Sequence, residues 1–306
     1  MPRPPINPEN ESDCLKAPPA ERYDAGRSRR EAFPLEAHAE AAPETDRTDP
    51  LIILAEQDKY RLANLVPLRY GRMSRNPFTF LRGAAGIMAS DLAAGARTNL
   101  RVELCGDAHL GNFRWYFAPN REQVFDLNDF DETLPGPFEW DVKRLAASVM
   151  VSARVNGFSA TQARAATRSA MRYYRRSIAE ASELSPLDLH YYRFRSDAAL
   201  ERIEKHGKSH RKWKEEVLEK ATRNNSLRAF DKLTDIVDGR RRIVADPPLI
   251  VPLDGMIATD ESDAVGRFLD RYRESLPLDR RMLLNRFSLV DIAQKVVGVG
   301  SVGIRC

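Results

Sequence analysis

Residues 105–132 combine the residue types that phosphoryl transfer requires. The segment begins Cys-Gly-Asp-Ala-His-Leu-Gly-Asn, and a short apolar stretch then leads to Asn-Asp-Phe-Asp-Glu. If one loop brings Asp107, Asn112 and Asp129 together, their carboxylate and amide oxygens can hold Mg²⁺ and orient a hydroxyl group. Phosphoryl transfer asks little more of a protein than positioning, metal ions and a carboxylate that accepts the hydroxyl proton.

The interval from Asp107 to Asn112 equals that of the kinase catalytic loop, His-Arg-Asp-x-x-x-x-Asn, in which Asp is the base and Asn binds a metal ion. Here Cys-Gly precedes the aspartate, and Asp-Phe-Asp replaces the kinase Asp-Phe-Gly. We therefore predict Asp107 as the catalytic base, and Asn112 and Asp129 as the Mg²⁺ ligands. His109 is a further catalytic candidate that braces the loop or contacts phosphate, and the alternative is a packed loop histidine.

The loop resembles that of the aminoglycoside and choline phosphotransferases, small-molecule kinases with the protein-kinase-like fold. Those enzymes carry His-Gly-Asp-x-His-x-x-Asn and then Ile-Asp-Phe/Trp-Asp/Glu. The Glu-Trp-Asp-Val run at 139–142 resembles their later Asp-Leu-Ala. The resemblance implies that Asp141 opens a helix and braces the loop, that ATP and Mg²⁺ are the cofactors, and that a hydroxyl-bearing molecule is the acceptor. Cys105 stands where that group has His, so the hydrogen bond of that His is not carried over.

A wider resemblance, from about Pro67 to Cys306, is to the bacterial domain-of-unknown-function 2252 family. It rests on Arg-Tyr-Gly-Arg-Met, Phe-Leu-Arg-Gly-Ala-Ala, Gly-Asp-Ala-His-Leu-Gly-Asn-Phe, the long run from Phe-Asp-Leu-Asn-Asp-Phe to Glu-Trp-Asp-Val-Lys-Arg-Leu, and Val-Val-Gly-Val-Gly-Ser-Val-Gly. That resemblance implies no established activity, so the functional prediction depends on the residues themselves.

Each site residue also has a simpler interpretation. Gly, Asp and Asn favour turns, Asp141 could be a plain helix N-cap, and the acidic residues after Phe125 could form a solvated strand end. Strand alternation places Asp126 and Asp129 on opposite faces. We favour Asp129 as the ligand, because it begins the Asp-Phe-Asp-Glu that matches the phosphotransferase pattern. The order of the residues and the strand signals on both sides favour the catalytic interpretation.

The chain ends with Gly-x-Gly-x-x-Gly between β-branched residues, formed by Gly298, Gly300 and Gly303. A Rossmann turn must open a helix, but only three residues follow the last glycine. The flanking valines suit two strands, so we predict a kinase-type flap in which the three glycines and Ser301 bind nucleotide phosphates. The alternative is a glycine-rich hairpin or a frayed end.

This flap follows the catalytic loop, whereas in kinases it precedes it, so the lobes would be permuted. A kinase flap also leads to a strand whose Lys pairs the phosphates, and the sequence ends before such a strand. The nucleotide lobe therefore looks truncated. This favours an alternative function, a catalytically inactive, pseudokinase-like module that binds a nucleotide or a metal ion.

We predict an α+β, protein-kinase-like fold with a mostly helical catalytic lobe over residues 49–288 and small β-hairpins. A disordered leader over 1–48 precedes it, and the nucleotide lobe begins over 289–306. The predicted helices are 50–65, about 87–94, 141–155, 161–181, 196–235, 264–276 and 280–287, and the predicted strands or hairpins are 78–81, 100–105, 113–118 with 123–128, and 236–244.

Arg82 lies just before one predicted helix. Because backbone N–H groups at a helix start attract anions, it is a candidate phosphate contact, and the alternative is a packing site of small residues. His206 and His210, four residues apart, could chelate a metal, but their basic neighbours favour a solvated face.

Composition sets the remaining limits. A charged fraction of 30% and a hydrophobic fraction of 42% are ordinary for a globular protein, and a formal charge of +4 suits anionic substrates. Glu residues interleave the basic stretch 202–220, so nucleic acid is not expected. No apolar run approaches the ~20 residues of a membrane helix. Three scattered cysteines without metal or disulfide spacing favour the cytoplasm.

Overall fold

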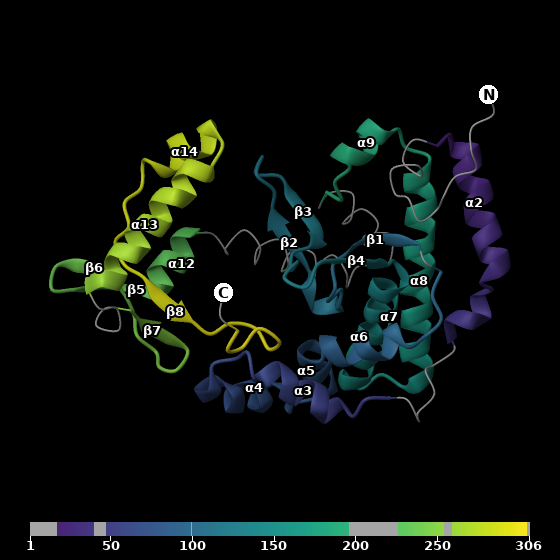
Figure 1. The fold of residues 1–306 in the computed structure, drawn as a ribbon, viewed down its shortest axis with the longest axis horizontal. Helices are drawn as coiled ribbons and strands as arrows, with labels where there is room; N and C mark the ends of the chain where they lie inside the picture. The colour runs from purple at the N-terminus through teal and green to yellow at the C-terminus, as the bar shows by residue number, and fades with distance from the viewer. Residues whose placement is uncertain (1–16, 40–46, 99, 196–225, 254–258, 305–306) are drawn as a thin grey trace, which may run out of the picture. The chain divides into compact units, whose positions relative to one another are not determined.

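The computed structural model describes residues 17–39, 47–98, 100–195, 226–253 and 259–304 (Figure 1). The described residues form a mixed α+β structure whose sheets are two-stranded and antiparallel, which confirms the α+β class. The chain divides into two compact units, residues 1–208 with 299–306, and residues 209–298. This division differs from the predicted boundaries after residues 48 and 288.

Short helices precede the candidate catalytic loop in the first unit. Asp49 caps α3 by accepting from the N–H of Leu51, as predicted, but the helix ends at Asp58. The predicted strand over 78–81 is wrong. Asn76 and Thr79 form a capping box that starts a helix there, with Pro at its first position. The helices and 3₁₀ turns of this region are α3 (Pro50–Asp58), η3 (Ala63–Leu65), α4 (Val66–Met73), α5 (Pro77–Gly83) and α6 (Ala85–Ala93).

These helices bury one apolar cluster, made of Leu54, Met73, Ala84, Ile87 and Val299. Val299 comes from the far end of the sequence. Its burial fixes the start of the glycine-rich segment against α3, α4 and α6, because apolar surface removed from water is a main source of folding free energy.

Two strand pairs frame the candidate loop. Strand β1 (Arg101–Leu104) pairs with β4 (Leu134–Pro137), and β2 (Phe113–Phe117) pairs with β3 (Gln123–Leu127) as the predicted hairpin. The sequence did not predict β4, because its Leu-Pro-Gly-Pro contains residues that disfavour strand interiors. A Cβ at Gly136 would lie 2.5 Å from Cδ1 of Leu104, so a larger residue there would displace that side chain.

Two long helices follow, α7 (Glu139–Val155) and α8 (Ala160–Ser182), and they lie side by side in Figure 1. Ser159 and Gln162 form a capping box at the start of α8. Both helices agree with the predicted spans to within two residues. The short α9 (Pro186–Tyr191) follows them.

The region before α3 differs from the expected disordered leader. Residues 19–32 form α2 (Pro19–Ala32), and η1 (Leu35–Ala39) follows. Arg29 of α2 donates to the backbone carbonyl of Thr98. Alanine and charged residues have high helix propensity, and Pro at N1 suits a helix start. The prediction of disorder rested on low hydrophobicity and did not take these helix signals into account.

The described residues of the second unit form two further strand pairs and three helices. The predicted hairpin around Asp238-Gly239 is confirmed, and both turn residues have positive φ, 51° and 74°, as hairpin turns require. Most of the predicted helix 196–235, with His206 and His210, lies outside the described residues, and its last two residues are strand. The elements are α12 (Ser226–Leu233), β5 (Thr234–Val237), β6 (Arg240–Ile243), β7 (Ile250–Pro252), α13 (Thr259–Ser275), α14 (Leu278–Leu284) and β8 (Ala293–Lys295).

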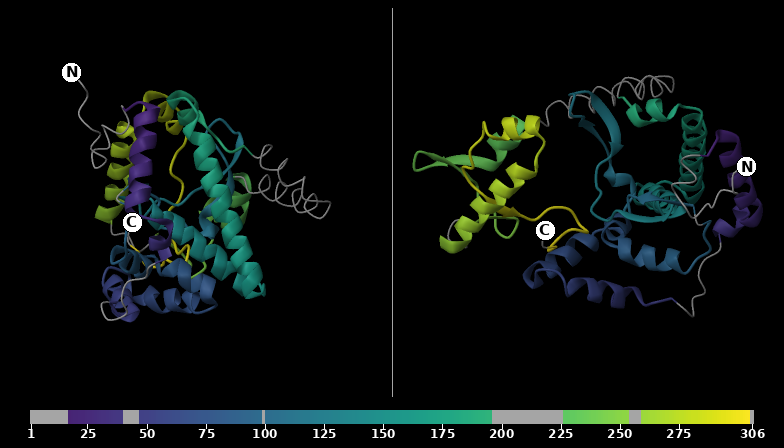
Figure 2. Two further views of the ribbon diagram at one scale, coloured as in Figure 1. Left: turned by 90° about the vertical axis from the view of Figure 1, so that its right-hand side faces the viewer. Right: turned by 45° about the horizontal axis from the view of Figure 1, so that its top comes forward.

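The glycine-rich segment is not the predicted strand-turn-strand. Strand β8 ends at Lys295, turns follow, and Ile304 makes only an isolated bridge with Arg61. Val299 and Val302 are buried instead of forming strands. Figure 2 shows this segment, in yellow, meeting the blue helices near α4. No helix in the described ranges is long and apolar enough to cross a membrane.

Candidate functional site

The loop after β1 is held by α7. The carboxylate of Asp141 accepts hydrogen bonds from the backbone N–H groups of Cys105, at 2.7 Å, and Gly106, at 3.1 Å. The helix begins at Glu139, so Asp141 is its third residue, and the interpretation of Asp141 as an N-cap is wrong. One carboxylate thus fixes the backbone that leads into Asp107.

Gly106 is required by both its conformation and its surroundings. Its φ of +79° lies in the left-handed region that side chains disfavour. A Cβ there would overlap the backbone carbonyl of Glu132. The preceding thiol, Cys105, has its pKa raised to about 12, first by burial and then by Asp141, so it stays protonated and is not a nucleophile.

Asp107 is buried, with 7% of its surface exposed, and it pairs with Arg144. The Nε of Arg144 lies 2.8 Å and its Nη2 2.7 Å from Oδ1 of Asp107. The same Nη2 donates to the carbonyl of Leu81 at 2.5 Å. Burial raises the pKa of Asp107, and the positive charges of Arg144 and Arg82 oppose that rise. The arginine pair leaves Oδ2 of Asp107 for other partners.

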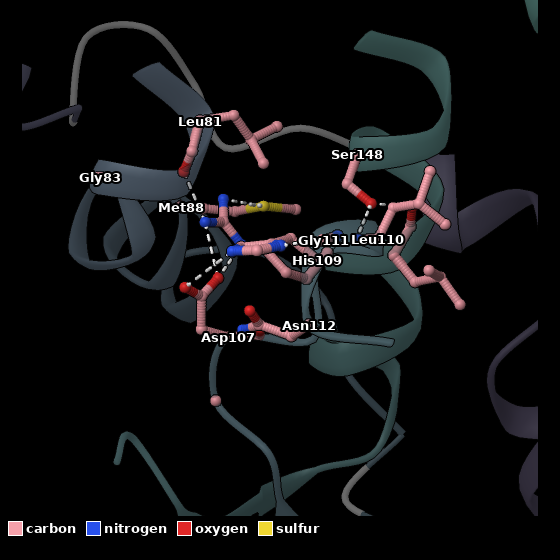
Figure 3. Close-up of polar contacts among 12 residues, drawn as sticks. Leu81, Gly83, Met88, Asp107, His109, Leu110, Gly111, Asn112 and Ser148 are labelled. Carbon is pink, nitrogen blue, oxygen red and sulfur yellow. Dashed lines mark hydrogen bonds and ion pairs between the residues drawn. The ribbon is translucent and has the colours of Figure 1, made fainter. Parts of the chain in front are cut away.

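His109 faces that second oxygen, with its Nε2 3.6 Å from Oδ2 of Asp107. The N–H of Gly111 donates to Nδ1 of His109 at 3.0 Å, so the proton of the neutral ring lies on Nε2. Burial, with the charges of Arg144 and Arg82, lowers the pKa of His109 to about 4. The ring is therefore a neutral donor at pH 7. Figure 3 shows Asp107 and His109 pointing toward one another, with Asn112 beside them.

Asn112 is fixed to Asp107. Its Nδ2 donates to the backbone carbonyl of Asp107 at 3.0 Å, and its own backbone N–H donates to the carbonyl of His109 at 2.9 Å. Among the residues that the structure describes, no group donates to its Oδ1. Asn112 is 3% exposed. A buried amide with one anchored end and one available oxygen is suited to cation coordination.

Asp129 reaches the loop through the hairpin. The register pairs Phe113 with Leu127, and the N–H of Asn128 donates to the carbonyl of Asn112 at 3.1 Å. Burial lowers the pKa values of His109 and Arg82, and the negative charge of Asp129 partly opposes that lowering. By contrast, Asp126 is exposed and accepts from its neighbour's N–H.

A magnesium ion needs few protein ligands, because it keeps waters and takes oxygens from substrate phosphates. In the described part of the chain, no group of three or more His, Cys, Asp or Glu side chains could hold a metal ion. The assignment of Asn112 and Asp129 as Mg²⁺ ligands stays a prediction.

Sequence reasoning missed Arg144 and Ser148. The Oγ of Ser148 accepts from the N–H of Leu110 at 2.8 Å. With Asp141, the two residues form a stripe at positions i, i+3 and i+7 of α7, which is one face of a helix. That polar stripe on an otherwise mixed helix was a readable signal.

Gly300, Ser301 and Gly303 belong to the first unit, and Gly298 is the last residue of the second. The carbonyls of Gly300 and Val302 accept from Nη1 of Arg61 at 2.7 and 2.6 Å, and the carbonyl of Gly303 accepts from the N–H of Leu62 at 2.8 Å. A Cβ on Gly300 would lie 3.1 Å from the carbonyl of Arg82. The turn therefore packs against the end of α5. Phosphate binding by the three glycines and Ser301 stays a prediction.

A cavity of about 210 Å³ adjoins the site. Arg144 and Gly106 line it together with a largely apolar wall, which includes Met88, Leu104 and Trp140. Since Arg144 also contacts Asp107, the cavity and the candidate base are neighbours.

Comparison with known proteins returns one family. The family model for uncharacterized proteins conserved in bacteria, DUF2252, matches residues 61–306. Neither a curated protein nor a solved structure matches the chain.

Proposed function

The chain belongs to the bacterial family DUF2252, whose description names no activity. From the residues of the site, we propose that the protein is a kinase-like phosphotransferase. The proposed reaction moves a phosphoryl group from ATP, with Mg²⁺, to a hydroxyl group of a small molecule. The proposed fold is protein-kinase-like in its catalytic part, with β1, the loop, the β2–β3 hairpin and α7 as the supporting elements.

The observation that carries the proposal is the bond between Asn112 and the backbone of Asp107. It fixes the amide relative to the carboxylate while leaving Oδ1 of Asn112 without a donor among the described residues. An amide that is held by its nitrogen, with an oxygen that accepts no hydrogen bond from the described residues, is suited to coordinate a cation.

In the proposed reaction, each side chain of the site has a separate role. Oδ2 of Asp107 accepts the proton of the acceptor hydroxyl, while the pair with Arg144 on Oδ1 holds the carboxylate in one orientation. Neutral His109 presents its Nε2–H to the same region. Mg²⁺ between Asn112 and Asp129 would neutralise phosphate charge. Asp141 keeps the loop in place through two backbone N–H groups.

A second candidate is a nucleotide- or metal-binding module without turnover. The observation that favours it is the buried pair between Asp107 and Arg144, because an arginine on one carboxylate oxygen weakens a base. In that case Asp107 anchors α7 to the loop and does no chemistry.

The test uses the full chain with Mg²⁺ and ATP, measuring nucleotide binding by calorimetry and phosphate transfer or release in parallel. Asp107→Asn should slow turnover by about 10²- to 10⁴-fold and leave nucleotide affinity unchanged. Asp126→Asn removes a carboxylate from the exposed hairpin face and is the matched control. Undiminished turnover in Asp107→Asn would remove it from the base role. Binding without any turnover in the parent chain would select the second candidate, and no binding at all would reject both.

A further inference from the structure

Arg82, at the end of α5, has no partner in the described structure. Its guanidinium makes no hydrogen bond or ion pair with any described residue, and its Nε is buried. Arg61 and Arg69 also have an unbonded, buried Nε, but their terminal nitrogens bind carbonyl or carboxylate oxygens. A half-buried guanidinium that no described carboxylate bonds directly is suited to bind an anionic ligand.

The position of Arg82 is at the catalytic loop. A Cβ on Gly111 would lie 3.8 Å from its Nε, and Gly111 lies between His109 and Asn112. The charged groups that act on Arg82 are Arg114, Asp107 and Asp129. Burial and the nearby Arg114 lower the pKa of Arg82, and the two aspartates raise it.

The two arginines at the loop therefore differ in what they can bind. Arg144 is committed to Asp107 and to the carbonyl of Leu81. The two terminal nitrogens of Arg82 have no partner among the described residues and are not buried, so they can donate to a ligand. The carbonyl of Arg82 also touches the glycine-rich turn at Gly300, so the residue lies between the two segments that carry the sequence motifs.

We propose that Arg82 binds the phosphoryl group that is transferred, the terminal phosphate of the nucleotide. This rests on the phosphotransferase function proposed above and names a cation that would face the terminal phosphate. A guanidinium presents a planar fork that matches phosphate oxygens, and its charge offsets the negative charge on the phosphoryl oxygens during transfer.

The experiment compares affinities of the full chain for Mg·ATP and Mg·ADP by calorimetry. Arg82→Gln should weaken Mg·ATP by roughly 10- to 100-fold, the usual range for a charge-assisted hydrogen bond, and should change Mg·ADP by less than about threefold. Arg82→Lys keeps the charge without the fork and should fall between the parent and Arg82→Gln. Arg75→Gln, at an exposed arginine before α5, is the matched control and should leave both affinities unchanged.

The outcomes separate the two proposals. Equal Mg·ATP affinity in the parent and Arg82→Gln would overturn the role of Arg82 while the phosphotransferase function stands. Equal weakening of Mg·ATP and Mg·ADP would also overturn it, because Arg82 would then act on Asp129 or on the inner phosphates. No nucleotide binding by the parent would reject both proposals. Because the guanidinium makes no bond to the described chain, Arg82→Gln should keep the parent's unfolding midpoint, and Arg82→Lys repeats the test if it does not.

Discussion

Replacing Arg144 by methionine should destabilise the protein strongly, because it leaves the carboxylate of Asp107 buried without its partner. Arg144 is 3% and Asp107 7% exposed. Removing one member of a buried ion pair typically costs about 3–5 kcal/mol, and the carbonyl of Leu81 loses a donor worth about 1 kcal/mol. We therefore expect a loss of about 4–6 kcal/mol, a large part of the ~5–15 kcal/mol that stabilises a typical domain.

The measurement is urea unfolding of the full chain, followed by circular dichroism and tryptophan fluorescence at pH 7. Lys143→Met is the control, because Lys143 is the preceding residue of α7 and makes no hydrogen bond or ion pair with a described residue; it should change stability by less than about 0.5 kcal/mol. Adding Asp107→Asn to Arg144→Met removes the uncompensated charge and should restore at least about 2 kcal/mol.

The pH dependence supplies a second check. Burial raises the pKa of Asp107 above its ordinary 3.8, and Arg144 holds that rise back. Without Arg144, the folded protein binds the Asp107 proton still more readily than the unfolded chain. Stability then falls as pH rises from 3.8 through the folded pKa, so the deficit of Arg144→Met should be smaller at pH 4 than at pH 7. A cost below about 1 kcal/mol, or a double variant no more stable than Arg144→Met, would refute this account of the pair.

Three further predictions concern the loop. Gly106→Ala should lower the free energy of unfolding by more than the ~1–2 kcal/mol of a left-handed φ, because its Cβ would also meet Glu132. Gly157→Ala, at φ +82° with open space, is the control and should lose only the cost of the left-handed φ. Equal losses in urea unfolding would contradict the packing at Gly106. The pKa of His109 is about 4 in the folded protein, against an ordinary 6.5, so its contribution to stability is present above pH 6.5 and is lost as pH falls toward 4. Its imidazole NMR signals should therefore not titrate between pH 8 and 5.5. A titration midpoint near 6.5 would contradict the burial of His109. Asp141→Asn should lower the free energy of unfolding by about 2–4 kcal/mol, because an amide cannot accept from both backbone N–H groups as the carboxylate does. An unchanged unfolding midpoint would show that these bonds do not hold the loop.

Elements with strong local signals could be predicted from the sequence. The hairpin of 113–117 and 123–127, the helices α7 and α8, and the capped start of α3 follow from alternation, helical periodicity and capping residues. Short apolar runs could not be assigned in the same way. Residues 78–81 look like a strand, yet the capping box at Asn76 makes them a helix.

The candidate site shows the same division. The order of Asp107, Asn112, Asp129 and Asp141 could be recognised from residue types and spacing, since those carry the chemistry. The polar stripe on α7 and the helix start near Arg82 are signals that could mark Arg144 and Arg82 as candidates. Their contacts with the loop could not be predicted, because packing between segments remote in the chain brings them there.

The amino-acid sequence alone therefore determined the local elements and the residue types available for chemistry, because propensity, capping and periodicity act over a few neighbouring positions. Tertiary structure decided which oxygen of Asp107 is taken by Arg144 and which nitrogen of His109 keeps the proton. It also decided that the C-terminal glycine-rich segment forms turns with buried valines and no strand pair. Those outcomes depend on desolvation and on contacts between segments far apart in the chain, which no local pattern encodes.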